Sequence, residues 1–120
     1  KGALPRDVLK ISALAGGSGA KSRISYCSEC SEVIVGNKEA KLHHAHKDQI
    51  IKHPTQKPFD LTRKLFLSCM PKHGKIVIPF AGTGSECMVA KAMGHEFVGF
   101  DLNPDFVKMS NLAIGRDIEL

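Results

Sequence analysis

The amino-acid sequence predicts an α/β fold whose second half holds a short parallel sheet. Two apolar runs, residues 76–78 and 97–100, are each followed by a segment of helical periodicity. The first run leads into a glycine turn at residues 79–84 (Pro-Phe-Ala-Gly-Thr-Gly), and the second ends in the acidic Asp101. Strand, helix and strand in this order are typical of a βαβ unit, in which the two strands are parallel.

A helix is predicted first, directly after Pro58. Phe59, Thr62 and Phe66 recur at helical spacing, and a proline and a glycine at residues 71 and 74 end the run. Proline is favourable at a helix start because its fixed φ suits the first turn. The run Ile-Val-Ile at residues 76–78 is β-branched and bounded by glycine and proline, which predicts a buried parallel strand.

The remaining elements follow in order. Residues 86–93 are predicted to form a helix that ends at Gly94, and residues 97–100 form the second strand. A last helix is predicted at residues 104–113, with Asn103 as its capping residue.

Residues 1–52 have a different character and are predicted to be rich in loops. The glycine-rich stretch at residues 15–20 is interpreted as a flexible loop, because the Lys-Ser pair after it is wrongly spaced for a phosphate-binding P-loop and lacks a preceding strand. Residues 26–52 are polar, carry cysteines and histidines, and show little periodicity. We therefore divide the chain into a loop-rich segment, 1–52, and an α/β segment, 53–120.

Composition narrows the setting of the protein. The 120 residues suffice for one core, and the chain starts at Lys1, so we expect a fragment of a longer protein. No apolar run approaches the roughly 20 residues that a membrane span needs, and four cysteines are too few for a disulfide scaffold, so we expect a cytoplasmic protein without a membrane partner. The net charge of +5 favours a polyanionic partner such as nucleic acid, although a solvated basic surface is an alternative.

The glycine turn and Asp101 together suggest a site for a nucleoside cofactor. Glycines let a ligand approach the backbone, and a carboxylate at the end of the next strand can accept hydrogen bonds from two ribose hydroxyls. A tight turn beside a solvated carboxylate is the alternative. A dinucleotide site is disfavoured because the third glycine of that pattern is missing, which also speaks against a nucleotide-dependent oxidoreductase.

Three segments in order resemble one family, the DNA amino-methyltransferases that use S-adenosylmethionine, in the class where the cofactor half follows the catalytic half. The segments are His53–Pro58 (His-Pro-Thr-Gln-Lys-Pro), the glycine turn, and residues 97–103, where an apolar strand ends in Asp-Leu-Asn. The resemblance covers about residues 50–115 and implies the C-terminal part of a Rossmann-like methyltransferase sheet.

The resemblance also implies roles for individual residues. Thr55 and Lys57 would line the methionine end of the cofactor, Asp101 would hold the ribose, and Leu102 or Asn103 would lie beside the adenine. The implied cofactor-binding set is Thr55, Lys57, Pro79, Phe80, Ala81, Gly82, Gly84, Asp101, Leu102 and Asn103. Methyl transfer from a sulfonium is an in-line displacement, so catalysis depends largely on alignment of the donor and the amino group.

The sequence departs from the family at two points. Ile78 stands where the family usually has Asp, so one polar contact to the cofactor is in doubt. The catalytic tetrapeptide, an Asp, Asn or Ser followed by Pro-Pro and an aromatic residue, does not occur in the 120 residues. In the family this motif lies upstream and engages the flipped base. We therefore expect the catalytic half on a missing N-terminal part of the same or another chain.

A Cys- and His-bearing insert precedes His53. Cys27 and Cys30, with His43 and His46, have a spacing that can close a tetrahedral zinc site, while thiols beside surface histidines or a redox pair are the alternatives. The family carries its target-recognition region here, so a zinc-clipped knob that touches DNA is one hypothesis. Phosphate contacts would come from the basic residues Arg6, Arg23, Lys38, Lys41, Lys47 and Lys52. Of these, Arg23, Lys41 and Lys47 are the predicted DNA-binding residues.

Cys69 and Cys87 fall on predicted helix faces and are expected in the core. The sequence as a whole predicts the cofactor-binding part of a DNA methyltransferase that acts on double-stranded DNA, on adenine N6 rather than cytosine N4, in restriction and modification. The alternative is a non-catalytic, zinc-clipped DNA-binding module with a degenerate Rossmann-like half, for which Ile78 is the supporting feature.

Overall fold

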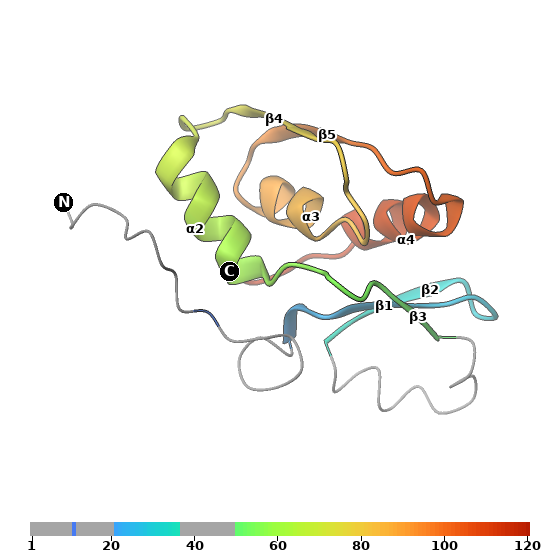
Figure 1. Cartoon of the computed structure of the whole chain (residues 1–120). Coiled ribbons are helices and arrows are strands. Elements are labelled where there is room, and N and C mark those ends of the chain that lie inside the picture. The colour runs from blue at the N-terminus through green and yellow to red at the C-terminus, as the bar shows by residue number, and fades with distance from the viewer. Residues whose placement is uncertain (1–10, 12–20, 37–49) are drawn as a thin grey trace.

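The computed structural model of the chain describes residues 11, 21–36 and 50–120 (Figure 1). Two small sheets and the helices between them make a mixed α/β structure, so the predicted α/β class is confirmed. In chain order the elements are β1 (Ile24–Cys27), β2 (Glu32–Val35), β3 (Ile50–Lys52), α2 (Phe59–Cys69), β4 (Lys75–Ile78), α3 (Ser85–Ala92), β5 (Glu96–Gly99) and α4 (Pro104–Ile114).

The first sheet is antiparallel and has the order β2-β1-β3. Tyr26 of the central strand lies opposite Val33 on one side and Ile51 on the other. The sequence predicts loops in this part of the chain, so these three strands correct that prediction. Strands of three or four residues are too short for periodicity to show, and β1 is buried along its whole length, which removes the alternation of apolar and polar residues.

The second sheet consists of β4 and β5, which are parallel and joined through α3. Val77 lies opposite Val98, and Ile78 lies opposite Gly99. This βαβ arrangement confirms the predicted element order, with bounds that differ from the prediction by one residue or so. Whether the pair belongs to a larger Rossmann-like sheet stays a prediction.

The helices lie between the two sheets, as Figure 1 shows. On one side, Ile24 and Tyr26 of β1 share a core with Met88 of α3 and Met109 of α4. On the other side, Ile78 of β4 packs with Cys87 of α3. The core therefore joins residues from both sides of the proposed boundary at residue 52, and that boundary itself stays a prediction.

The two helix cysteines differ. Cys87 is buried, as predicted, and its burial followed by the negative charge of Glu86 raises the pKa of its thiol to about 11. Cys69 at the end of α2 is exposed, so its predicted core position is wrong. No helix in the described ranges is long and apolar enough to cross a membrane.

Candidate functional site

The candidate site lies where the carboxyl ends of β4 and β5 meet the glycine turn. The amide of Ala81 donates a hydrogen bond of 2.8 Å to the carbonyl of Phe100, which ties the turn to the end of the second strand. Gly82 adopts a φ of 53°, in the left-handed region that favours glycine. The backbone is therefore folded back on itself at the edge of the sheet where open α/β folds bind ligands.

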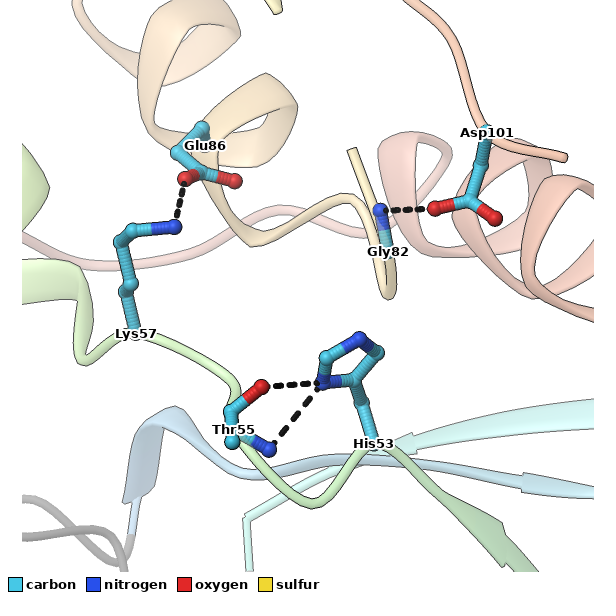
Figure 2. A network of polar contacts seen from close by, with 6 residues as sticks. All are labelled: His53, Thr55, Lys57, Gly82, Glu86 and Asp101. Carbon is cyan, nitrogen blue, oxygen red and sulfur yellow. Dashed lines mark hydrogen bonds and ion pairs between the residues drawn. The ribbon is translucent and has the colours of Figure 1, made fainter. Parts of the chain in front are cut away.

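Asp101 fixes this turn with its side chain, as Figure 2 shows. Its Oδ2 accepts a hydrogen bond of 2.9 Å from the amide of Gly82. Its Oδ1 accepts one of 2.8 Å from the amide of Asn103. The Asn103 side chain in turn accepts from the amide of Asp105 at 2.9 Å, which confirms the predicted helix cap. The carboxylate is thus held in one orientation, and each oxygen retains a further lone pair for a ligand hydroxyl.

The second glycine of the turn has a packing reason for its lack of a side chain. A Cβ atom at Gly84 would lie 2.7 Å from the Cβ of Ser110 in α4, closer than such atoms approach. Gly84 therefore allows α3 and α4 to come together beside the turn. A role in contact with a cofactor, as the resemblance implied, stays a prediction.

The His53–Pro58 segment connects the two sheets. Buried Gln56 accepts a hydrogen bond of 2.9 Å from the amide of Ile24, and its own amide group donates to the carbonyl of Ser22. The hydroxyl of Ser22 accepts a bond of 3.3 Å from the amide of Phe59, at the start of α2. Gln56 therefore fastens the segment to the beginning of β1, next to the start of α2.

His53 lies at the other end of this segment, with its ring beneath the glycine turn (Figure 2). Its Nδ1 accepts a hydrogen bond of 3.1 Å from the amide of Thr55. Its carbonyl accepts one of 3.1 Å from the guanidinium of Arg23. The ring packs against that of Phe106 in α4, with centroids 4.9 Å apart. A Cβ atom at Gly82 would lie 3.1 Å from the ring, so the two residues are neighbours and the ring leaves little room for a side chain at residue 82.

Lys57 reaches the first turn of α3. Its Nζ lies 2.9 Å from Oε1 of Glu86, whose side chain is largely covered. The helix N-terminus favours a carboxylate at this position. The ion pair brings the Lys57 ammonium to the helix that follows the glycine turn, while the Lys57 side chain itself stays 54% exposed.

The surface next to the turn is apolar. Phe80 of the glycine turn and Leu102, the residue after Asp101, are both highly exposed. An open hollow of about 560 Å³ lies beside Asp101 and Leu102, along α4. Such a surface can cover a planar ring while Asp101 binds a neighbouring hydroxyl group.

Two further positions in the strand and the turn are buried, Ile78 and Thr83. Ile78 is buried and packs with Ala81 and Cys87, so its side chain serves the core. The hydroxyl of Thr83 is also buried, and it has no hydrogen-bond partner among the described residues. A buried hydroxyl without a partner is costly, so this atom marks a place where a further group would be stabilising.

The predicted metal and DNA sets are only partly described. Cys27 and Cys30 lie at the hairpin between β1 and β2, and desolvation together with a hydrogen bond to Cys27 raises the pKa of the Cys30 thiol. His43 and His46 fall outside the described residues, as do Lys41 and Lys47. Among residues 11, 21–36 and 50–120 no three potential ligands form a metal cluster, and the zinc site stays a prediction.

Three residues that hold the site together, His53, Gln56 and Glu86, are not among the predicted site residues. His53 and Gln56 lie within the His53–Pro58 motif, in which only Thr55 and Lys57 are predicted to bind the cofactor. The motif is therefore the feature of the sequence that could have indicated them. Glu86 follows the glycine turn directly, and an acidic residue in the first turn of a helix is a common stabilising feature. Arg23, which was chosen as a DNA contact, also supports His53 from the first sheet.

The chain is similar to known DNA methyltransferases. A family model described as DNA methylase matches residues 20–112. The chain is 32% identical over 65 residues to the type II methyltransferase M2.LlaDCHI of Lactococcus lactis subsp. cremoris, covering 54% of this chain and 24% of that protein. It is 37% identical over 68 residues to the type II methyltransferase M2.DpnII of Streptococcus pneumoniae, covering 57% and 25%.

A third relative is the DNA adenine methyltransferase YhdJ of Escherichia coli (strain K12), which is 36% identical over 62 residues, covering 52% of this chain and 21% of that protein. The matched part thus spans about a quarter of the length of these relatives. The family match, in contrast, extends over most of the chain and includes both sheets and the site between them. The chain belongs to the DNA methylase family of N6 and N4 amino-methyltransferases.

Proposed function

We propose that this chain binds S-adenosylmethionine as the cofactor-binding part of a DNA amino-methyltransferase. The observation that carries the proposal is the fastening of Asp101 to the Gly82 amide at 2.9 Å, directly above the His53–Pro58 segment. A carboxylate that is held at the end of a strand next to a bare backbone turn is suited to a ribose diol. The three motifs of the family resemblance thus lie side by side in space.

The residues present fit this cofactor. Asp101 keeps lone pairs for two hydroxyls, and the open hollow beside Leu102 can receive an adenine ring. Lys57 supplies a cation that can attract the carboxylate of the methionine end, since its ammonium reaches α3 next to the turn. The Thr83 hydroxyl offers a buried polar atom that gains from a partner.

When bound, S-adenosylmethionine supplies a methyl group on a sulfonium. The residues of this chain would bind and orient it, because an in-line transfer depends on the alignment of donor and acceptor. A catalytic half, on the same or another polypeptide, would hold the flipped base of double-stranded DNA. We propose adenine N6 as the methylated position and restriction and modification as the setting, since the relatives include an adenine methyltransferase and type II methyltransferases.

Calorimetric titration of S-adenosylmethionine into the folded chain tests this proposal. Binding is expected, and Asp101→Ala should weaken it roughly 10- to 150-fold for each ribose hydrogen bond that is lost, because a hydrogen bond to a charged group contributes about 1.5–3 kcal/mol. Asp117→Ala is a matched control, since Asp117 is a fully exposed carboxylate near the C-terminus. A folded wild-type chain that does not bind the cofactor, or an Asp101→Ala variant that binds as well as Asp117→Ala, would contradict the proposal.

A non-catalytic, zinc-clipped DNA-binding module is the second candidate. The observation in its favour is Ile78, which packs in the core at the position where the family usually carries Asp. This candidate predicts zinc in the purified chain, DNA binding that is lost with a chelator, and no affinity for S-adenosylmethionine. Metal analysis and the titration above therefore separate the two functions.

A further inference from the structure

His53 directly follows β3 of the first sheet, and Figure 2 shows its ring beneath the glycine turn. A Cβ atom built on Gly82 would lie 3.1 Å from Cδ2 and 3.2 Å from Nε2 of the His53 ring. Such contacts are tighter than most that a real Cβ makes. The His53 ring therefore fills the space in which a side chain at residue 82 would lie, and it limits how far the turn can move toward the ring.

Two contacts fix the orientation of the His53 ring, and a third holds its backbone. The amide of Thr55 can only donate, so Nδ1 must accept its hydrogen bond of 3.1 Å, and the proton of the neutral ring is then on Nε2. The Phe106 ring packs against it from α4. Arg23 holds the His53 carbonyl at 3.1 Å. The imidazole thus presents its Nε2 edge to Gly82.

The position of Gly82 sets the position of Asp101 in turn. The Gly82 amide donates to Oδ2 of Asp101, while the Asn103 amide binds the other oxygen. If the turn moves, the first of these bonds lengthens and the carboxylate is free to rotate about its remaining bond. A chain of direct contacts therefore runs from Arg23 through His53 and Gly82 to Asp101.

We propose that His53 is a positioning residue for the cofactor site: its ring, held in the Nε2–H tautomer, fixes the glycine turn and through it the Asp101 carboxylate. This inference rests on the proposed function, because its effect is measured on the affinity for S-adenosylmethionine. His53 acts through the turn and needs no contact with the cofactor. The contact also explains why residue 82 must be a glycine beyond its positive φ.

A double-mutant cycle tests the proposal. His53→Asn removes the ring from Gly82 while its amide oxygen can still accept from Thr55, and Gly82→Ala adds the Cβ that would meet the ring. In the wild-type background Gly82→Ala should lower the affinity about tenfold or more. In the His53→Asn background the loss should be smaller by at least about threefold, within the range known for residues in contact.

Gly94 and His73 provide the matched control pair. Gly94 also has a positive φ, of 77°, and its added Cβ would lie 3.4 Å from the His73 ring, at ordinary contact distance. Gly94→Ala should therefore lower the unfolding free energy without changing the affinity for S-adenosylmethionine. This should hold both in the wild-type background and in the His73→Asn background. Gly82→Asn replaces Gly82→Ala if the latter does not fold, because Asn tolerates a positive φ.

The outcomes separate this inference from the proposed function. Losses of affinity that simply add, in chains that bind the cofactor, overturn the positioning role. Coupling that appears in the unfolding free energy but not in the affinity also overturns it, because His53 would then be structural only. A folded wild-type chain that does not bind S-adenosylmethionine overturns the proposed function, and this inference with it.

Discussion

The two sheets of the molecule differ in what they bury and in what they carry. Every residue of β1, the centre of the antiparallel sheet, is buried. In the parallel pair, Val77 is 66% and Val98 46% exposed, although parallel strands are normally covered on both faces. The candidate site lies at the exposed pair, and no part of it is formed by the buried strand itself. The antiparallel sheet thus acts as a scaffold, while the parallel pair presents the chemistry.

The His53–Pro58 segment is the connection between these regions. Gln56 binds the scaffold at Ile24, whereas His53 and Lys57 reach the glycine turn and α3. This short segment therefore binds the scaffold through Gln56 and reaches the site through His53 and Lys57. The comparison predicts that changes in the scaffold affect the whole chain, and that changes near the site have smaller and more local effects.

The largest effect is expected from Ile24→Ala. Ile24 is fully buried and shares a core with Met88 and Met109, which belong to the helices that support the site. Truncation of such a side chain costs about 2–5 kcal/mol. Denaturant unfolding, followed by circular dichroism, should show this loss in one transition that includes both regions.

Val77→Ala is the matched control, because Val77 is a β-branched residue of the exposed pair. It should change the unfolding free energy by less than about 0.5 kcal/mol, as is usual for surface positions. Two separate transitions, or equal costs of the two substitutions, would show that the scaffold and the parallel pair do not form one cooperative unit.

Gln56→Ala is expected to have the next largest effect. It leaves the buried amide of Ile24 and the carbonyl of Ser22 without their partner, at a cost of about 1–3 kcal/mol. Gln56→Glu keeps an acceptor for Ile24 but loses the donor to Ser22 and adds a buried charge. It should therefore be no more stable than Gln56→Ala. Thermal unfolding measures both; wild-type stability of either variant speaks against a fastening role.

The parallel pair and its helices were predictable because each signal is local. Gly94 ends α3, Asn103 caps α4, and the β-branched run at residues 76–78 is bounded by glycine and proline. The predicted pairing of the glycine turn with Asp101 is also explained by chain order, since parallel strands bring their carboxyl ends to one edge.

The antiparallel sheet and the fastening contacts were not predictable in this way. One partner of β1 is β3, which begins at Ile50. Their pairing therefore depends on contacts between distant parts of the chain. Gln56 and Arg23 carry ordinary polar side chains, whose structural roles arise only when Ile24 and His53 come close. Neither composition nor periodicity records such contacts.

The smallest effect is expected at the Lys57–Glu86 ion pair, with Lys75–Glu96 as its matched control. Both pairs involve the parallel region, but Glu86 is only 15% exposed, whereas both members of the control pair are more than 70% exposed. A double-mutant cycle with Lys57→Met and Glu86→Gln should give a coupling of about 0.2–1 kcal/mol in the unfolding free energy, and the control pair should give less. Screening by salt should weaken the control coupling more strongly, because exposed charges are screened most. If the two couplings are equal, Glu86 does not hold Lys57 at the site, and the scaffold end of the His53–Pro58 segment alone determines its position.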